Sequence, residues 1–357
     1  ARGDVTLAPY DAVLLVSFGG PDGPDDVLPF LRNATRGRGI PDARLAQVGA
    51  HYALFGGRSP INARNAELAA ALGAELAARG AGAPVVVGNR NWHPFLAEAL
   101  RGLADRGARR VLCLITAAYA SYSGCRQYRE DLAGALAEIG VEVELAKIGP
   151  YAETAGFVAA NADALVAACA QVGGRPQVLF VTHSLPLAMD AAAGPGPAEG
   201  TYRAQHLRVA ARVVEAARER LGFEPAWDLA FCSRSGPPQV PWLEPDVNDR
   251  LRALAAAGAS EVVVAPIGFI SDHLEVAYDL DTEAAATASE VGLRFARAAT
   301  AGVHAAFVAA LADALLLRAA VARGEADEPP GARYRCASTC CLPGRPGPVG
   351  AAALSAG

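Results

Sequence analysis

Short runs of β-branched and other apolar residues alternate along the chain with longer segments rich in Ala, Leu, Arg and Glu, in which apolar positions recur every three or four residues. The runs are typical of buried parallel strands, and the longer segments are typical of the helices that connect them. The pattern predicts eight strands, at residues 12–18, 84–88, 110–116, 142–148, 177–182, 227–232, 261–267 and 293–299. Long helices are expected at 153–172 and 303–323.

The eight predicted strands divide into two sets of four. The third and fourth strands begin at residues 110 and 142 in the first set and at 261 and 293 in the second, 32 residues apart in both. This regularity predicts an α/β protein with two similar doubly wound, Rossmann-like parallel-sheet domains that face each other across a cleft. We expect an N-terminal α/β domain at 8–150, a C-terminal α/β domain at 151–323, and a linker with a cysteine-bearing tail at 324–357 that ends in disordered residues.

Charge and composition remove several classes of function. The chain has 32 basic and 37 acidic side chains and a formal net charge of −5, so nucleic acid is not an expected partner. Lys147 is the only lysine and no glycine run precedes it, which argues against a P-loop and against a Schiff-base enzyme. Because we find neither a strongly apolar stretch of about 18 residues nor an export signal, we expect a cytoplasmic protein with no integral membrane segment.

Polar residues at the carboxyl ends of the strands are the first candidates for a site, because ligands of open α/β sheets bind there. His183 follows the apolar run VLFVT and precedes Ser184, where the chain must leave the sheet. A neutral imidazole at that place can accept a proton or bind a divalent metal ion. The alternative is a histidine that only caps the next helix.

Three carboxylates follow the strand at 261–267, on a helix that is expected to begin after a glycine. Glu275, Asp279 and Glu283 are spaced at i, i+4 and i+8, which places them in one column on one helix face. Like charges stacked in this way repel, so a column buried in the cleft must carry cations or protons. A solvated acidic face is the alternative.

The long connection after the first strand carries basic and hydroxyl side chains, including Arg36, Tyr52 and Ser59. Connections of this length are uncommon unless they are functional. Arginine is suited to bidentate contacts with carboxylates, so the connection is a candidate site for an anionic ligand. Ordinary surface arginines are the alternative.

Three of the seven cysteines, Cys336, Cys340 and Cys341, fall in the last 22 residues. A disulfide framework is not expected in a cytoplasmic chain of this size. The crowding of thiols beyond a linker therefore calls for another explanation.

Six segments of the chain resemble one known family, the ferrochelatases, which insert ferrous iron into a porphyrin. They read LVSFGGP, GNRNWHPF, TAAYASYSG, FVTHSLP, SRSGPPQVPWLEPDV and PIGFISDHLEVAYDLD, and they extend over nearly the whole chain. The resemblance implies that His183 is the metal-site and proton-accepting histidine and that Glu275 is its partner across the cleft. It also implies that Asp279 and Glu283 continue the metal site as an acidic column. A site with one imidazole and one carboxylate is loose enough to release the ion.

The chain is most similar to the Gram-positive, actinobacterial branch of the family. That similarity implies coproporphyrin III as substrate, Fe²⁺ as the inserted ion, and a place in haem biosynthesis. It implies porphyrin binding by Phe18, Arg36, His51, Tyr52, Ser59, Tyr122 and Tyr128. The apolar lining of the cleft is expected to include Leu54, Phe55, Trp242 and Ile270. Many members of the branch have a tyrosine where this chain has Phe18, which puts axial ligation of the product iron from that side in question.

The tail cysteines resemble the C-terminal [2Fe–2S] ligands of some ferrochelatases. The resemblance implies a cluster held by Cys125, Cys336, Cys340 and Cys341, because such a cluster takes four thiolates. Zinc on the same thiolates and a free tail are the alternatives.

Other functions stay open at this point. One is a protoporphyrin IX ferrochelatase. Another is a cobalt or nickel tetrapyrrole chelatase, which typically has two metal-binding histidines, whereas here only His183 is found at a strand end. A third is a non-catalytic haem- or cluster-binding sensor, which would not need a proton acceptor opposite an acidic column. We expect a monomer with transient partners in the haem pathway.

Overall fold

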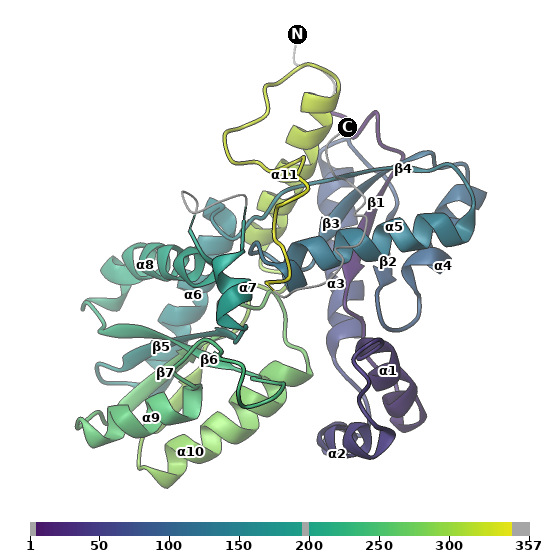
Figure 1. Cartoon of the computed structure of the whole chain (residues 1–357). Coiled ribbons are helices and arrows are strands. Elements are labelled where there is room, and N and C mark those ends of the chain that lie inside the picture. The colour runs from purple at the N-terminus through teal and green to yellow at the C-terminus, as the bar shows by residue number, and fades with distance from the viewer. Residues whose placement is uncertain (1–4, 195–199, 345–357) are drawn as a thin grey trace.

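The computed structural model describes residues 5–194 and 200–344, which form two separate four-stranded parallel sheets (Figure 1). The strand order is β2-β1-β3-β4 in the first sheet and β6-β5-β7-β8 in the second, so both halves have the same topology. The strands are β1 (Ala12–Ser17), β2 (Val85–Asn89), β3 (Arg110–Ile115), β4 (Glu144–Lys147), β5 (Gln177–His183), β6 (Trp227–Cys232), β7 (Glu261–Ala265) and β8 (Arg294–Arg297). All eight predicted strands and the doubly wound α/β fold are confirmed, with strand ends within two residues of those predicted.

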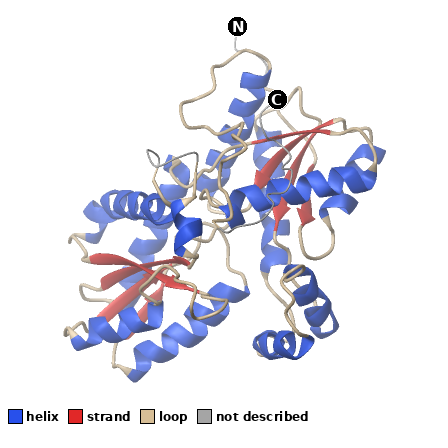
Figure 2. Ribbon diagram, in the orientation of Figure 1, coloured by secondary structure: helices blue, strands red, loops and turns tan. Residues whose placement is uncertain are grey.

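Helices lie on both faces of each sheet (Figure 2). The first half contains η1 (Pro24–Asp26), α1 (Val27–Ala34), α2 (Asp42–Ala53), α3 (Ile61–Ala78), α4 (Leu96–Asp105), η2 (Tyr122–Arg126) and α5 (Gln127–Ile139). The second half contains α6 (Ala155–Val172), α7 (Leu187–Ala191), α8 (Tyr202–Leu221), α9 (Val247–Ala256), η4 (Val276–Ala284), α10 (Ala285–Glu290) and α11 (Ala305–Ala322). The expected long helices at 153–172 and 303–323 are α6 and α11.

The second strand in each order, β1 or β5, is buried on both faces, which explains why it reads as an unbroken apolar run. Residues 12–16 of β1 and residues 179–181 of β5 are all 0% exposed. β1 pairs in parallel with β2 and β3, and β5 pairs in parallel with β6 and β7. The loops that leave β1 and β5 therefore start from the interior of each sheet, at its carboxyl edge.

Helix α11 packs against α3 of the first half and α6 of the second, and Figure 1 shows it between the two sheets. The Phe307 ring of α11 lies 5.9 Å from that of Tyr151 and 5.5 Å from that of Phe157. Arg79 of α3 forms an ion pair with Asp313 of α11 at 2.5 Å. One apolar core thus extends across both halves. The domain boundary near residue 150 therefore stays a prediction from the sequence.

Two helices, α6 and α11, are long and apolar enough to cross a membrane by length and composition alone. A helix in the core of a globular protein passes the same test, so this finding is weak evidence for a membrane span and does not contradict the prediction. Both helices bury large shares of their surface in the core, where α6 packs between α8 and α11. Their apolarity is explained by this packing, because a core helix surrounded by other elements is hydrophobic on most sides.

The last expected feature, disorder at residues 351–357, lies outside the described residues.

Candidate active site

His183 is the last residue of β5, where the chain leaves the second sheet. Its Nδ1 donates a hydrogen bond to the backbone oxygen of Ser184, which leaves the lone pair of the ring on Nε2. Nε2 lies 3.8 Å from Oε1 of Glu275. The two residues predicted to face each other are thus brought together, with the accepting nitrogen of the imidazole toward the carboxylate.

The loop after β7 reaches this place because it contains Gly268. A Cβ atom at Gly268 would lie 1.9 Å from Oγ1 of Thr182, which is far too close. The glycine therefore lets the loop pass directly against the end of β5. Glu275, seven residues later, precedes the first residue of η4.

Asp279 and Glu283 lie on η4, a π-helix, rather than on the α-helix that the spacing predicted, and Glu275 immediately precedes it. Asp279, within η4, accepts a hydrogen bond from Ser233 in the loop after β6, whose φ of +59° is rare for a residue with a side chain. Burial, together with the nearby charges of Glu275 and Glu283, raises the pKa of Asp279 to about 6 against the opposing hydrogen bond from Ser233. The three carboxylates are therefore close enough to affect one another, as the column hypothesis requires. Glu283 also accepts a hydrogen bond from Tyr278.

A second histidine, His273, lies beside the pair, and the sequence reasoning missed it. Its Nε2 is 3.9 Å from Oε2 of Glu275, and its Nδ1 accepts a hydrogen bond from the backbone nitrogen of Val276 at 3.3 Å. Burial lowers the pKa of His273, which favours the neutral ring. His183 is still the only histidine at the end of a strand, and His273 reaches the same carboxylate from the loop after β7.

The wall opposite the pair comes from the first half. Tyr52 of α2 packs edge-on against Phe30 at 6.0 Å, and Phe18, at the end of β1, packs against the same ring at 6.1 Å. Burial raises the pKa of Tyr52, and the charge of Glu275 raises it further. His51 of α2 stacks on Tyr278 of η4 with ring centres 4.2 Å apart. Helices α2 and η4 are thus in contact through this ring pair, and the cleft between the two halves stays a prediction.

The other residues expected to bind porphyrin differ in exposure. Tyr128 is 5% exposed and lies 4.9 Å from the guanidinium of Arg90, which is also 5.7 Å from the Phe18 ring. Ser59 is buried, Arg36 is exposed and donates to Asn33, and Tyr122 donates to Glu130 at 3.0 Å. Of the expected apolar lining, Leu54 is exposed, Phe55 and Trp242 are half-buried, and Ile270 is buried. Arg90 was not predicted, because no local pattern shows that it lies between Phe18 and Tyr128.

The four cysteines of the proposed cluster come together in one buried group, with Cys125 from η2 and the others from the tail. Hydrogen bonds from the Cys125 and Cys340 thiols hold the pKa of Cys336 well below its usual range. Within residues 5–194 and 200–344, no set of three or more His, Cys, Asp or Glu side chains is arranged as a metal site. The gathering of the thiols agrees with the expectation, and the nature of any bound group stays a proposal.

Comparison with known proteins decides the family. The profile described as Ferrochelatase matches residues 10–318. The chain belongs to the ferrochelatase family. As a ferrochelatase it is a metal chelatase, an enzyme of the lyase class, which confirms the resemblance on which the site was predicted.

Relatives in this family match most of the chain's length. A protein of Streptomyces griseus named coproporphyrin III ferrochelatase is 52% identical over 332 residues, covering 90% of this chain and 88% of the relative. One of the same name from Streptomyces coelicolor is 50% identical and covers 98% of this chain and 97% of the relative. The solved structure of SirB from Bacillus subtilis with Fe³⁺ is 12% identical, with a TM-score of 0.50, covering 88% of this chain and 98% of SirB. That likeness confirms the fold alone.

The geometry of this ferrochelatase site predicts unequal roles for its carboxylates. Glu275→Gln is expected to lower the turnover of iron insertion by about 10²-fold or more, because it removes the charge nearest to Nε2 of His183. Glu283→Gln is the matched control, and we expect it to lower turnover less than about fivefold, because Glu283 lies eight residues after Glu275 in the chain. Steady-state kinetics of both variants measure this difference. Equal, small losses would indicate a solvated acidic face.

Proposed function

We propose that this ferrochelatase inserts Fe²⁺ into coproporphyrin III and releases iron coproporphyrin III and two protons. The observation that carries the reaction is the pair of His183 and Glu275, 3.8 Å apart, opposite the aromatic wall of Phe18 and Tyr52. The names of the relatives, at 50% and 52% identity, support coproporphyrin III as the substrate. Protoporphyrin IX is the alternative substrate.

The chemistry requires a base, because two pyrrole N–H protons must leave as the ion enters. His183 is suited to accept the first at Nε2, since its Nδ1 proton is held by the oxygen of Ser184. Glu275 can take that proton or pair with the imidazolium that forms. Asp279, with a pKa raised to about 6, is suited to exchange protons near neutral pH. Together with Glu283 it extends the row of carboxylates along which the ion is proposed to approach the site. The iron is a substrate here and leaves with the product.

Porphyrin binding is assigned to the first half. Phe18 and Tyr52 offer ring surface to the macrocycle, and His51 stands beside them on α2. Arg36 is exposed near this wall and is suited to a propionate carboxylate. Ser59, Tyr122 and Tyr128 complete the proposed binding set; the buried Tyr128 would act together with Arg90 above its ring.

The four gathered cysteines fit a [2Fe–2S] cluster by their donor chemistry, which requires four thiolates away from water. Cys125, Cys336, Cys340 and Cys341 would hold it, and the cluster would supply an oxidisable group that joins the tail to the first half. Zinc on the same residues is the rival.

The expected location and assembly accompany this proposal. We propose that the enzyme works in the cytoplasm as a monomer, with transient partners in the haem pathway, and that it binds no nucleic acid. The net charge of −5 supports the last point.

An insertion assay tests the substrate. Under anaerobic conditions with Fe²⁺, we expect kcat/KM for coproporphyrin III to exceed that for protoporphyrin IX by at least about tenfold, because only the former offers four carboxylates to the cleft. Cobalt and nickel salts are assayed in parallel, because His273 gives the site the second histidine typical of the alternative chelatases. Faster insertion into protoporphyrin IX would overturn the assignment of coproporphyrin III as substrate, and faster insertion of cobalt would overturn the assignment of Fe²⁺ as the inserted metal. Tight binding of porphyrin without turnover would indicate a sensor.

A further inference from the structure

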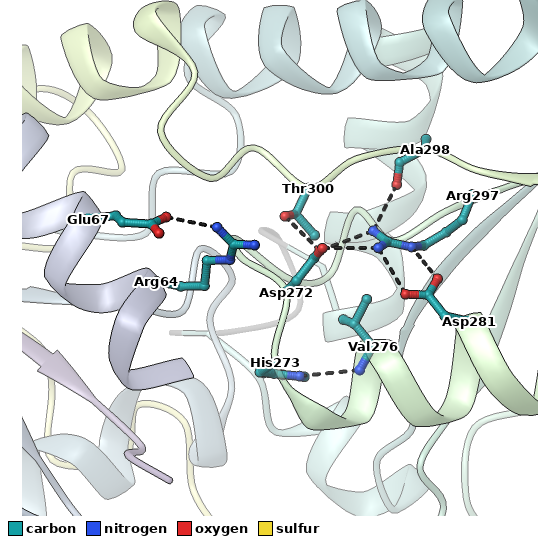
Figure 3. A network of polar contacts seen from close by, with 9 residues as sticks. All are labelled: Arg64, Glu67, Asp272, His273, Val276, Asp281, Arg297, Ala298 and Thr300. Carbon is teal, nitrogen blue, oxygen red and sulfur yellow. Dashed lines mark hydrogen bonds and ion pairs between the residues drawn. The ribbon is translucent and has the colours of Figure 1, made fainter. Parts of the chain in front are cut away.

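One arginine outside the proposed catalytic set holds two carboxylates at once. Arg297, at the end of β8, binds Asp272 in a bidentate contact, with Nη1 to Oδ1 and Nη2 to Oδ2 both at 3.0 Å. The same guanidinium donates from Nε to Oδ1 of Asp281 at 2.5 Å and from Nη2 to Oδ2 at 3.0 Å. Figure 3 shows the guanidinium between the two carboxylates. Its side chain is 16% exposed, so these contacts are largely shielded from water.

The two carboxylates bracket the segment that carries the proposed metal chemistry. Asp272 precedes His273, and Asp281 lies within η4 beyond Asp279, so Glu275 lies between the two clamped positions. Thr300, in the loop after β8, also donates to Asp272 at 3.1 Å. The segment that bears Glu275 is therefore tied to the end of β8 at both of its ends.

This segment has little packing on one side. A cavity of about 310 Å³ lies between α3 and the loops after β7 and β8, and Ser271, Asp272 and Thr300 are among the residues that line it. Figure 3 shows Arg64 and Glu67 of α3 across this space from Asp272. A π-helix follows, whose hydrogen bonds are of an uncommon type. On its other side the segment is packed in the core of the second half, where Val276 and Leu280 are both 0% exposed. The polar contacts of Asp272 and Asp281 therefore act in addition to this apolar packing and fix the two ends of the segment.

We propose that Arg297 is a positioning residue for iron insertion. By clamping Asp272 and Asp281, its guanidinium fixes the distance between Glu275, on the held segment, and His183, on β5. His183 does not depend on this clamp, because β5 lies inside its sheet between β6 and β7. The inference rests on the proposed role of the His183 and Glu275 pair.

The shape of the guanidinium matters as much as its charge. An ammonium group on a lysine stem is a point charge that cannot present paired N–H groups to two carboxylates at once. Arg297→Lys therefore keeps the charge and loses the clamp. Asp281→Asn removes charge from the outer arm only, at a carboxylate that is 42% exposed, so it disturbs the fold least.

The test compares these two variants with Arg294→Gln. Arg294 lies at the opposite end of β8 and, within residues 5–194 and 200–344, forms an ion pair with Glu261 instead of Asp272 or Asp281, so it serves as the matched control. We expect Arg297→Lys to raise the KM for Fe²⁺ by about tenfold or more and to lower kcat, because small displacements of a reacting group are costly. Asp281→Asn should change the same constants in the same direction by about threefold. The KM for porphyrin should stay within about twofold in every variant, because the porphyrin wall belongs to the first half.

Thermal unfolding separates positioning from plain stability. If Arg297→Lys and Asp281→Asn lower only the unfolding midpoint, and the KM for Fe²⁺ stays at the value of the Arg294→Gln control, the inference is overturned. Equal increases in the KM for iron and the KM for porphyrin would overturn it too, because they would indicate general damage to the cleft. If the unaltered protein inserts no metal into any porphyrin, the proposed function fails, and that outcome is distinguishable from failure of the clamp.

Discussion

His183→Ala is expected to lower the turnover of iron insertion by about 10²–10⁴-fold, the range that a general base contributes. The variant loses Nε2, which faces Oε1 of Glu275 at 3.8 Å, and no other neutral nitrogen takes its place at the end of β5 among the described residues. His273 is not expected to replace it, because its Nδ1 accepts a hydrogen bond from Val276, so the neutral ring carries its proton on Nε2, the nitrogen nearer to Glu275. Porphyrin binding should persist, because Phe18 and Tyr52 are unchanged.

The measurement pairs steady-state insertion with quenching of porphyrin fluorescence on binding. His304→Gln is the matched control, because the His304 side chain is 34% exposed against 32% for His183 and also has an acidic partner, Asp163, at 2.8 Å. We expect the control to keep turnover within about twofold. Near-normal turnover in His183→Ala would remove the histidine from the mechanism, and loss of porphyrin binding in that variant would reassign it to substrate binding.

The fold could be predicted from the sequence because its strands are buried on both faces. Residues 12–16 and 179–181 read as unbroken apolar runs for that reason, and their repeated spacing indicated two similar halves. What the pattern could not show is how far the halves share a core. The rings of Phe307 and Tyr151 meet across 156 positions of sequence, and no periodicity encodes such a contact.

The site could be predicted only where a residue has a local signal. His183 ends an apolar run, and Glu275, Asp279 and Glu283 form a regular spacing, so all were found. Ser233 and Arg297 have no such signal, because their importance comes from partners that are 46 positions away for Ser233 and 16 and 25 positions away for Arg297. The π-helix was read as an α-helix, since carboxylates spaced four apart share a face in both.

The position of the cysteine-bearing tail could be predicted only in part from the sequence. Sequence resemblance named the four cysteines, and the structure gathers them and adds how the tail is held. Arg126 donates to the backbone oxygens of Ser338 at 2.7 Å and Cys340 at 3.2 Å, and the backbone nitrogen of Gly194 donates to Sγ of Cys341 at 3.2 Å. Arg126 belongs to the first half and Gly194 to the second, so the tail contacts both.

Cys125→Ser is expected to remove the visible absorption of the purified protein and to lower its midpoint of thermal unfolding by several degrees. Cys125 is the single thiol of the group that comes from the body of the first half, so its loss detaches the bound group from η2. A group held by thiolates stabilises the folded chain only while its ligands are in place. Anaerobically purified protein should contain two irons and two acid-labile sulfides per chain, and the variant should contain neither.

Cys169→Ser is the matched control, because Cys169 is also buried but lies in α6, away from the four gathered thiols. It should keep the iron, the sulfide and the absorption, and any stability that it loses should be the same in the presence and absence of an iron chelator. In the unaltered protein the chelator should lower the unfolding midpoint toward that of Cys125→Ser, and in Cys125→Ser it should have no further effect. If metal analysis finds zinc in place of iron, the same four thiols bind a zinc ion and the cluster assignment is wrong. Iron retained in Cys125→Ser would refute the ligand set, and the proposed chemistry of His183 and Glu275 would stand, because neither residue belongs to that group.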